Sequence, residues 1–102
     1  MFYQKFKSII DALIKDLEAI RARGANVTYS WLSKTDEDMS AYSFVNVTDY
    51  NFEHGIFLKT QGDPIDISAG RIKDMTRSKE PDEIMTYIID CDDISYYISM
   101  IL

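Results

Sequence analysis

The sequence predicts one α+β domain, in which an N-terminal amphipathic helix is followed by an antiparallel sheet of about five strands. Apolar residues recur every three or four positions over the first twenty residues, which is the period of a helix. After Gly24 they alternate with polar residues at a period of two, which is the period of a strand. A chain of 102 residues fits one domain, with the helix over 1–23 and mostly sheet over 26–102.

The helix is predicted by a single apolar stripe about six turns long. Charged residues fall mostly between the members of the stripe. Arg21 and Arg23 lie where the helix dipole favours positive charge, and Gly24 permits the left-handed conformation that ends many helices. The stripe consists of Phe2, Phe6, Ile9, Ile10, Leu13, Leu17 and Ile20.

Alternating or β-branched segments predict the strands, and polar segments between them predict the loops. Val27, Tyr29 and Trp31 alternate with Thr28 and Ser30 in the first strand. The following elements are a loop over 33–40, a strand over 42–47, a turn over 49–55 and a strand over 56–60.

A strong turn signal follows the third strand, because Gly62 permits positive φ and Pro64 fixes its own φ. Ile65 and Ile67 then alternate with polar residues. We expect a bend at residues 68–70, buried positions at Ile72 and Met75 within 71–76, and a polar connector over 77–82.

Two interpretations of the last segment remain open. Residues 84–89 and 94–101 alternate as a hairpin turned at Cys91-Asp92-Asp93 would. A short helix that begins at Pro81 is the competing interpretation, since proline and acidic residues favour the first turn of a helix. In either arrangement, we expect the sheet to curl into a small barrel or to wrap against the helix.

Four short segments, at residues 27–29, 55–58, 65–67 and 71–72, resemble the strand order of WYL-type small barrels, which are Sm-like in fold. The resemblance covers about half of the chain. It implies a regulatory module that binds a ligand or nucleic acid, with Arg71 as the one residue matching the ligand pocket. Ile56-Phe57-Leu58 departs from the Trp-Tyr-Leu of that family.

The composition excludes several classes of function. A formal charge of −6 argues against direct binding to nucleic acid or to anionic membranes, and favours a basic protein partner. Charged residues interrupt every candidate membrane span, and residues 1–7 contain no apolar run of signal-peptide length. The single cysteine cannot form an intramolecular disulfide, so we expect a cytoplasmic protein.

No motif predicts catalysis, a cofactor or a metal. His54 is the only histidine and is expected in an exposed turn, without a group to orient it. Three aspartates surround Cys91 and disfavour its thiolate, so the thiol is expected to be unreactive. Glycine-rich phosphate loops and metal-ligand spacings are missing from the sequence.

The aromatic residues around the first two predicted strands are expected to pack in the core. A stacking platform for single-stranded nucleic acid would need basic neighbours, and this region is acidic. The residues concerned are Tyr29, Trp31, Tyr42 and Phe44.

The charges are distributed unevenly along the chain. Residues 1–34 carry six basic and three acidic groups, whereas residues 80–102 carry six acidic groups and no lysine or arginine. Because charge complementarity speeds encounter and tyrosine supplies contact area, this closing segment predicts a surface for a basic partner. The expected contact residues are Asp90, Asp92 and Asp93, with Glu83, Tyr87 and Tyr97 at the rim.

The sequence therefore predicts a non-enzymatic acidic protein that inhibits or neutralises a basic partner, such as a toxin or a nucleic-acid-handling protein. The alternative is an Sm-like regulatory module that binds a ligand or self-associates. The oligomeric state is open, and a homodimer is compatible with the sequence.

Overall fold

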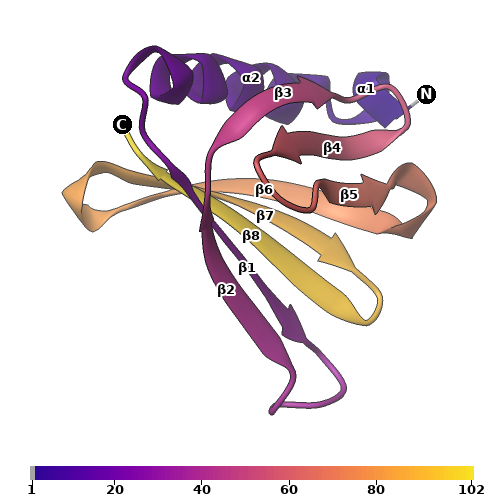
Figure 1. Ribbon diagram of the computed structural model, residues 1–102. Helices are drawn as coiled ribbons and strands as arrows, with labels where there is room; N and C mark the ends of the chain where they lie inside the picture. Colours follow the sequence, from indigo (N-terminus) through magenta and orange to yellow (C-terminus); the bar gives the residue numbers. More distant parts are fainter. Residues whose placement is uncertain (1) are drawn as a thin grey trace.

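The computed structural model describes residues 2–102, with Asp82 described by its backbone alone. In this part of the chain, a helical N-terminus precedes eight strands that form two antiparallel sheets (Figure 1). Sheet A has the strand order β2-β1-β8-β7-β6, and sheet B has the order β3-β4-β5. The predicted α+β class is confirmed. Of the two expected arrangements, the closed barrel does not form, because the two sheets do not pair into one closed sheet, and sheet A packs against the helix instead.

The strands of sheet A are the longer ones. They are β1 (Val27–Ser33), β2 (Ser40–Val45), β6 (Ile72–Glu80), β7 (Ile84–Cys91) and β8 (Ile94–Ile101). The strands of sheet B are β3 (Val47–Asn51), β4 (Gly55–Thr60) and β5 (Ile65–Ser68). Two 3₁₀ turns, Ala69–Arg71 and Pro81–Glu83, precede β6 and β7.

The helical segment is interrupted once, which the sequence pattern does not predict. Helix α1 (Phe2–Lys5) and helix α2 (Lys7–Ala22) are separated by Phe6, whose φ of −119° and ψ of 29° leave the helical region. At the other end, Ala25 N–H donates to Ile20 C=O, and Gly24 has a φ of +65°. This is a Schellman motif, and it confirms the predicted helix end at Gly24.

Helix α2 and sheet B cover the same face of sheet A (Figure 1). The core lies between sheet A on one side and helix α2 with sheet B on the other. The buried residues of the helix are Ile10, Leu13, Leu17 and Ile20, all members of the predicted stripe, together with Asp16. Sheet A contributes alternate residues of β7 and β8 to this core. They are Met85, Tyr87, Ile89 and Cys91, and Tyr96, Ile98 and Met100.

Two predicted loops are strands in the structure. The predicted strand over 42–47 is divided at Asn46 into β2 and β3, and β3 extends into the predicted turn over 49–55. Strand β6 continues through most of the predicted connector over 77–82, because it pairs with β7 as far as Glu80↔Ile84. Both segments belong to edge strands, whose exposed side chains are polar, so hydrophobic alternation is weak there.

Several other sequence predictions are confirmed. Strands β7 and β8 form the predicted hairpin around Asp92 and Asp93, and the competing helix from Pro81 is limited to the single 3₁₀ turn Pro81–Glu83. Ile72 and Met75 are buried. None of the helices in the described residues has the length and apolar character needed to span a membrane.

Gly55 is required where β4 begins. A Cβ atom at this position would lie 2.1 Å from Ile67 O, and the φ of Gly55 is +140°. Only glycine accommodates this close approach between β4 and β5. The hydrogen bond from Ala69 N–H to His54 C=O, at 2.9 Å, joins the same two chain segments.

Candidate functional site: the open face of sheet A

The aspartates of the β7–β8 hairpin are paired with cations from other parts of the chain. Asp90 lies 2.5 Å from Lys34 Nζ, and Asp92 lies 2.9 Å from Lys73 Nζ. Asp93 lies 4.0 Å from the guanidinium of Arg71. Hydrogen bonds from Lys34 and Ser95 lower the pKa of Asp90 below its usual value. The hairpin is therefore far less negative in space than its sequence indicates.

Tyr87 does not lie at the rim of a contact surface, and this expectation is wrong. Its side chain is completely buried, because residues of β7 alternate between faces and Tyr87 points toward α2. Its hydroxyl donates to the buried carboxylate of Asp16, and Arg77 Nε donates to the same hydroxyl at 2.9 Å. Burial raises the pKa of Tyr87, and Asp16 raises it further.

The other two predicted rim residues lie apart from each other. Glu83 is exposed at the end of the 3₁₀ turn that precedes β7. The aspartates that it was expected to border begin with Asp90, near the opposite end of β7. Tyr97 is half-buried on β8, on the face of sheet A that points away from α2. The six predicted contact residues therefore do not form one patch.

The face of sheet A that points away from α2 and sheet B is open. Among its described side chains on all five strands, none is buried. Four of its apolar side chains are strongly exposed. They are Tyr42 (66%), Phe44 (66%), Ile101 (60%) and Leu32 (45%).

Tyr42 and Phe44 were expected in the core, and this expectation is wrong. Both point to the open face, where their rings meet edge to face with centroids 5.3 Å apart. In the same ladder, Ser43 is opposite Tyr29 and Ala41 is opposite Trp31, so these four side chains point to the covered face. The two aromatic pairs therefore lie on opposite sides of sheet A and form no common stacking platform.

One end of the open face is hollowed. The hollow has a volume of about 650 Å³ and crosses the sheet from β2 to β7. Tyr42 and Phe44 line one side, and the cross-strand pair Ile84 and Ile101 lines the other. The guanidinium of Arg23 donates to Ile101 C=O at 3.0 Å at the margin of the hollow. The rest of the lining includes the polar side chains of Asn26, Thr28 and Ser99, so the hollow combines apolar and polar groups.

Acidic groups lie along the β6 edge of the open face and in the loop at the end opposite the hollow. Asp74 and Glu80 are exposed on β6, and Asp74 lies directly across from Asp90. The loop between β1 and β2 carries Asp36, Glu37 and Asp38, all exposed. Among the described residues, Asp74, Glu80 and the three carboxylates of the loop form no ion pair, whereas Asp90 is paired with Lys34. The open face therefore combines an apolar end, at the hollow, with carboxylates on the β6 edge and in the β1–β2 loop.

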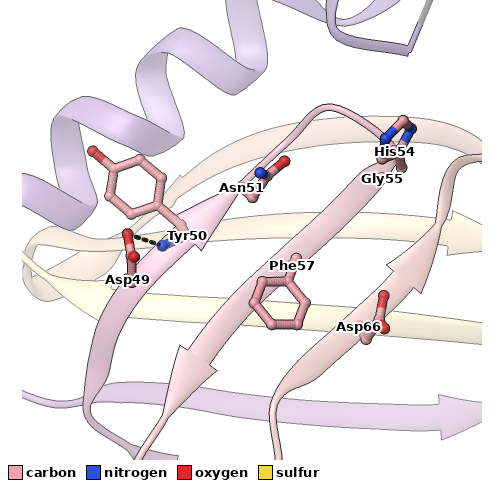
Figure 2. A pocket seen from close by; sticks show the side chains of 7 residues that line it. All are labelled: Asp49, Tyr50, Asn51, His54, Gly55, Phe57 and Asp66. Atoms are coloured by element: carbon pink, nitrogen blue, oxygen red, sulfur yellow. Dashed lines mark hydrogen bonds between the residues drawn. The ribbon is translucent and has the colours of Figure 1, made fainter.

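A second, shallower hollow lies on the exposed face of sheet B and has a volume of about 420 Å³ (Figure 2). Asp49 and Asp66 lie on either side of the ring of Phe57, and His54 lies at the upper margin. The imidazole is 95% exposed, and its Nε2 is 4.0 Å from the Glu53 carboxylate. In the described part of the chain, no hydrogen bond holds the imidazole in one orientation.

Cys91 is buried, which agrees with the prediction of an unreactive thiol. The main cause differs from the predicted one. Burial raises the pKa of the thiol more than the neighbouring Asp93 and Asp90 do, and Arg71 opposes the shift. Arg71 itself donates to the hydroxyl of Tyr96 at 2.9 Å, so the residue suggested by the small-barrel resemblance is engaged within the domain.

Comparisons with known proteins found no matching family model, no similar curated protein and no similar solved structure. The functional argument therefore depends on the surfaces of this chain.

Proposed function

We propose that this protein is a non-enzymatic binding protein that neutralises a basic protein partner through the open face of sheet A. One observation carries the proposal: exposed apolar side chains gather at one end of this face, and exposed carboxylates lie along its β6 edge and in the β1–β2 loop. Burial of Tyr42, Phe44 and Ile101 would supply affinity, whereas Asp74 and Glu80 would steer a positively charged partner into place.

The proposed surface differs from the acidic hairpin that the sequence predicted. Ion pairs with Lys34, Lys73 and Arg71 already occupy the hairpin carboxylates, and a partner would have to displace these cations. Asp74 and Glu80 need no such exchange. A partner with an apolar protrusion surrounded by lysine or arginine side chains fits this face best. The net charge of −6 favours such a basic partner, and the single cysteine is compatible with action in the cytoplasm.

Variant-dependent capture tests the proposal. Immobilised wild-type protein and the double variant Ile84→Ser with Ile101→Ser are exposed to host lysate, and the retained proteins are compared. Ile84 and Ile101 form a cross-strand pair in the hollow, away from the free edge of β2. Met39→Ser is the matched control, because Met39 is exposed in the loop outside this face.

We expect a basic protein to be retained by the wild type and by the control, and to be lost with the double variant. Its retention should also weaken with salt, and Asp74→Asn with Glu80→Gln should reduce that salt dependence. The activity of the retained protein should fall when the wild type is added. If the immobilised wild type, double variant and control retain identical sets of proteins, the proposal is contradicted.

A further inference from the structure

The two sheets have four edge strands among the described residues, and three of them are protected against pairing with another chain. Strand β6 carries Lys73, Asp74, Lys79 and Glu80 and is irregular between Ile72 and Asp74. Strand β5 has four residues, follows Pro64 and carries Asp66. Strand β3 carries Asp49 and is irregular between Val47 and Asp49. Charges, bulges and short length are the ordinary means by which sheet edges avoid association.

Strand β2 has none of these protections. Its sequence Ser-Ala-Tyr-Ser-Phe-Val contains no charged residue and no proline, and it pairs with β1 without a register shift. Its first five residues are exposed. Figure 1 shows β2 at the outer edge of sheet A, in a hairpin with β1 that extends away from α2 and sheet B.

The free hydrogen-bonding groups of β2 can be assigned from the ladder with β1. Ser33 N–H donates to Met39 C=O at 2.9 Å, so the odd-numbered residues of β2 direct their main-chain groups toward β1. The main-chain N–H and C=O groups of Ser40, Tyr42 and Phe44 therefore point to the free edge. An uncharged strand with three such residues is a template for one more antiparallel strand.

We propose that β2 pairs with β2 of a second copy of this chain, around a two-fold axis at Ser43, so that two five-stranded sheets become one continuous sheet. In this register, Tyr42 of each copy lies opposite Phe44 of the other. The two aromatic cross-strand pairs join the intrachain Tyr42–Phe44 contact in one cluster on the open face.

Electrostatics favours a second copy over the basic partner at this edge. A basic strand would find no carboxylate on β2, whereas a second copy meets no like charge along the strand despite the net charge of −6. The acidic loops with Asp36, Glu37 and Asp38 precede β2 in each copy. Because the pairing is antiparallel, these loops lie at opposite ends of the shared edge and do not face each other.

Charge exchange at Ser43 tests the pairing. Ser43 is exposed, and in the proposed dimer it lies directly opposite its own copy, so Ser43→Glu and Ser43→Lys each place like charges together. Molar mass is measured by light scattering over a wide concentration range. The matched controls are Ser68→Glu and Ser68→Lys, which place the same charges on the exposed Ser68 of β5.

We expect a reversible dimer for the wild type and for both controls. Each Ser43 variant should raise the dissociation constant by at least about tenfold. An equimolar mixture of the two Ser43 variants should restore the dimer, which a mere loss of folding would not allow. A wild type that stays monomeric, a dimer unaffected by both variants, open-ended aggregates, or a mixture that fails to pair would overturn the proposal. None of these measurements involves the basic partner, so the outcome is independent of the proposed function.

Discussion

The two edges of sheet A differ in almost every property that decides whether a strand associates. Strand β6 is tied to the domain: Ile72 and Met75 are buried, Lys73 pairs with Asp92, and Arg77 contacts Tyr87 and Asp16. Strand β2, all of which the structure describes, has no ion pair and no buried side chain, and its large side chains Tyr42 and Phe44 are exposed. The contacts that stabilise the domain are therefore concentrated at the β6 edge of sheet A, whereas the features that allow association are concentrated at the β2 edge.

The largest predicted effect concerns the polar cluster that anchors β6 and β7 to α2. Asp16→Ala removes the acceptor for the Tyr87 hydroxyl and the ion-pair partner of Arg77. Because Tyr87 is buried, its hydroxyl would lose a partner that water cannot easily replace. We expect a loss of about 2–4 kcal/mol in the free energy of unfolding, measured in urea.

The control for this variant is Lys15→Ala, because Lys15 is the exposed neighbour of Asp16 on α2. It should change the free energy of unfolding by less than about 0.5 kcal/mol. Equal stability of the wild type and Asp16→Ala would show that β6 is not anchored in this way.

A second prediction removes the protection of β6. Replacing Asp74, Lys79 and Glu80 by threonine leaves the edge uncharged over much of its length, while Arg77 keeps its contacts. Because β6 would then lack most of the charges that discourage pairing, both edges of sheet A would be able to pair. We therefore expect species larger than a dimer. Association through β6 should strengthen by at least about tenfold, which corresponds to roughly 1.4 kcal/mol.

The matched control replaces Glu53, Lys59 and Asp63 by threonine. It removes the same charges from exposed positions of the loops and strands around sheet B. Light scattering should show no species larger than the wild type for this control. If the triple variant of β6 keeps the wild-type molar mass, the charges of β6 are not what prevents association at that edge.

The smallest predicted effect concerns pH. The ion pair with Lys34 lowers the pKa of Asp90 in the folded state, so the pair stabilises the fold at pH values above the unfolded pKa of about 3.9. This contribution is lost as the pH falls through the depressed folded pKa. Both side chains are partly exposed, so screening limits the contribution to less than about 1 kcal/mol.

Unfolding measured in urea at neutral and acidic pH checks this prediction. Asp90→Asn should be less stable than the wild type at neutral pH, and the two proteins should converge at acidic pH. Asp63→Asn, at an exposed turn residue, should follow the wild type throughout. A constant difference between Asp90→Asn and the wild type over the whole range would exclude the ion pair as its cause.

The sequence predicts well those elements whose buried side chains repeat regularly. The helical stripe and the β7–β8 hairpin are in place, because their buried residues recur at the period of a helix and of a strand. The Gly24 cap is in place because glycine readily adopts the positive φ that ends the helix. Edge strands β3 and β6 were partly missed, since one exposed face and one free edge weaken their pattern.

The candidate site was harder to predict than the fold. Charge summed along the chain shows which carboxylates have no sequence neighbour of opposite sign. It does not show that Lys34, Arg71 and Lys73 reach Asp90, Asp93 and Asp92 from other elements. Alternation in β2 likewise separates Tyr42 and Phe44 from Ala41 and Ser43, but it does not indicate which of the two faces is covered.

Amide hydrogen exchange of β2 is the measurement that tests the unequal edges most directly. At high protein concentration, the amides of Tyr42 and Phe44 should be protected to a degree similar to those of Ala41 and Ser43, which point toward β1. On dilution, protection should fall at Tyr42 and Phe44 and persist at Ala41 and Ser43. Unprotected exchange of Tyr42 and Phe44 at every concentration would contradict the assignment of β2 as the associating edge.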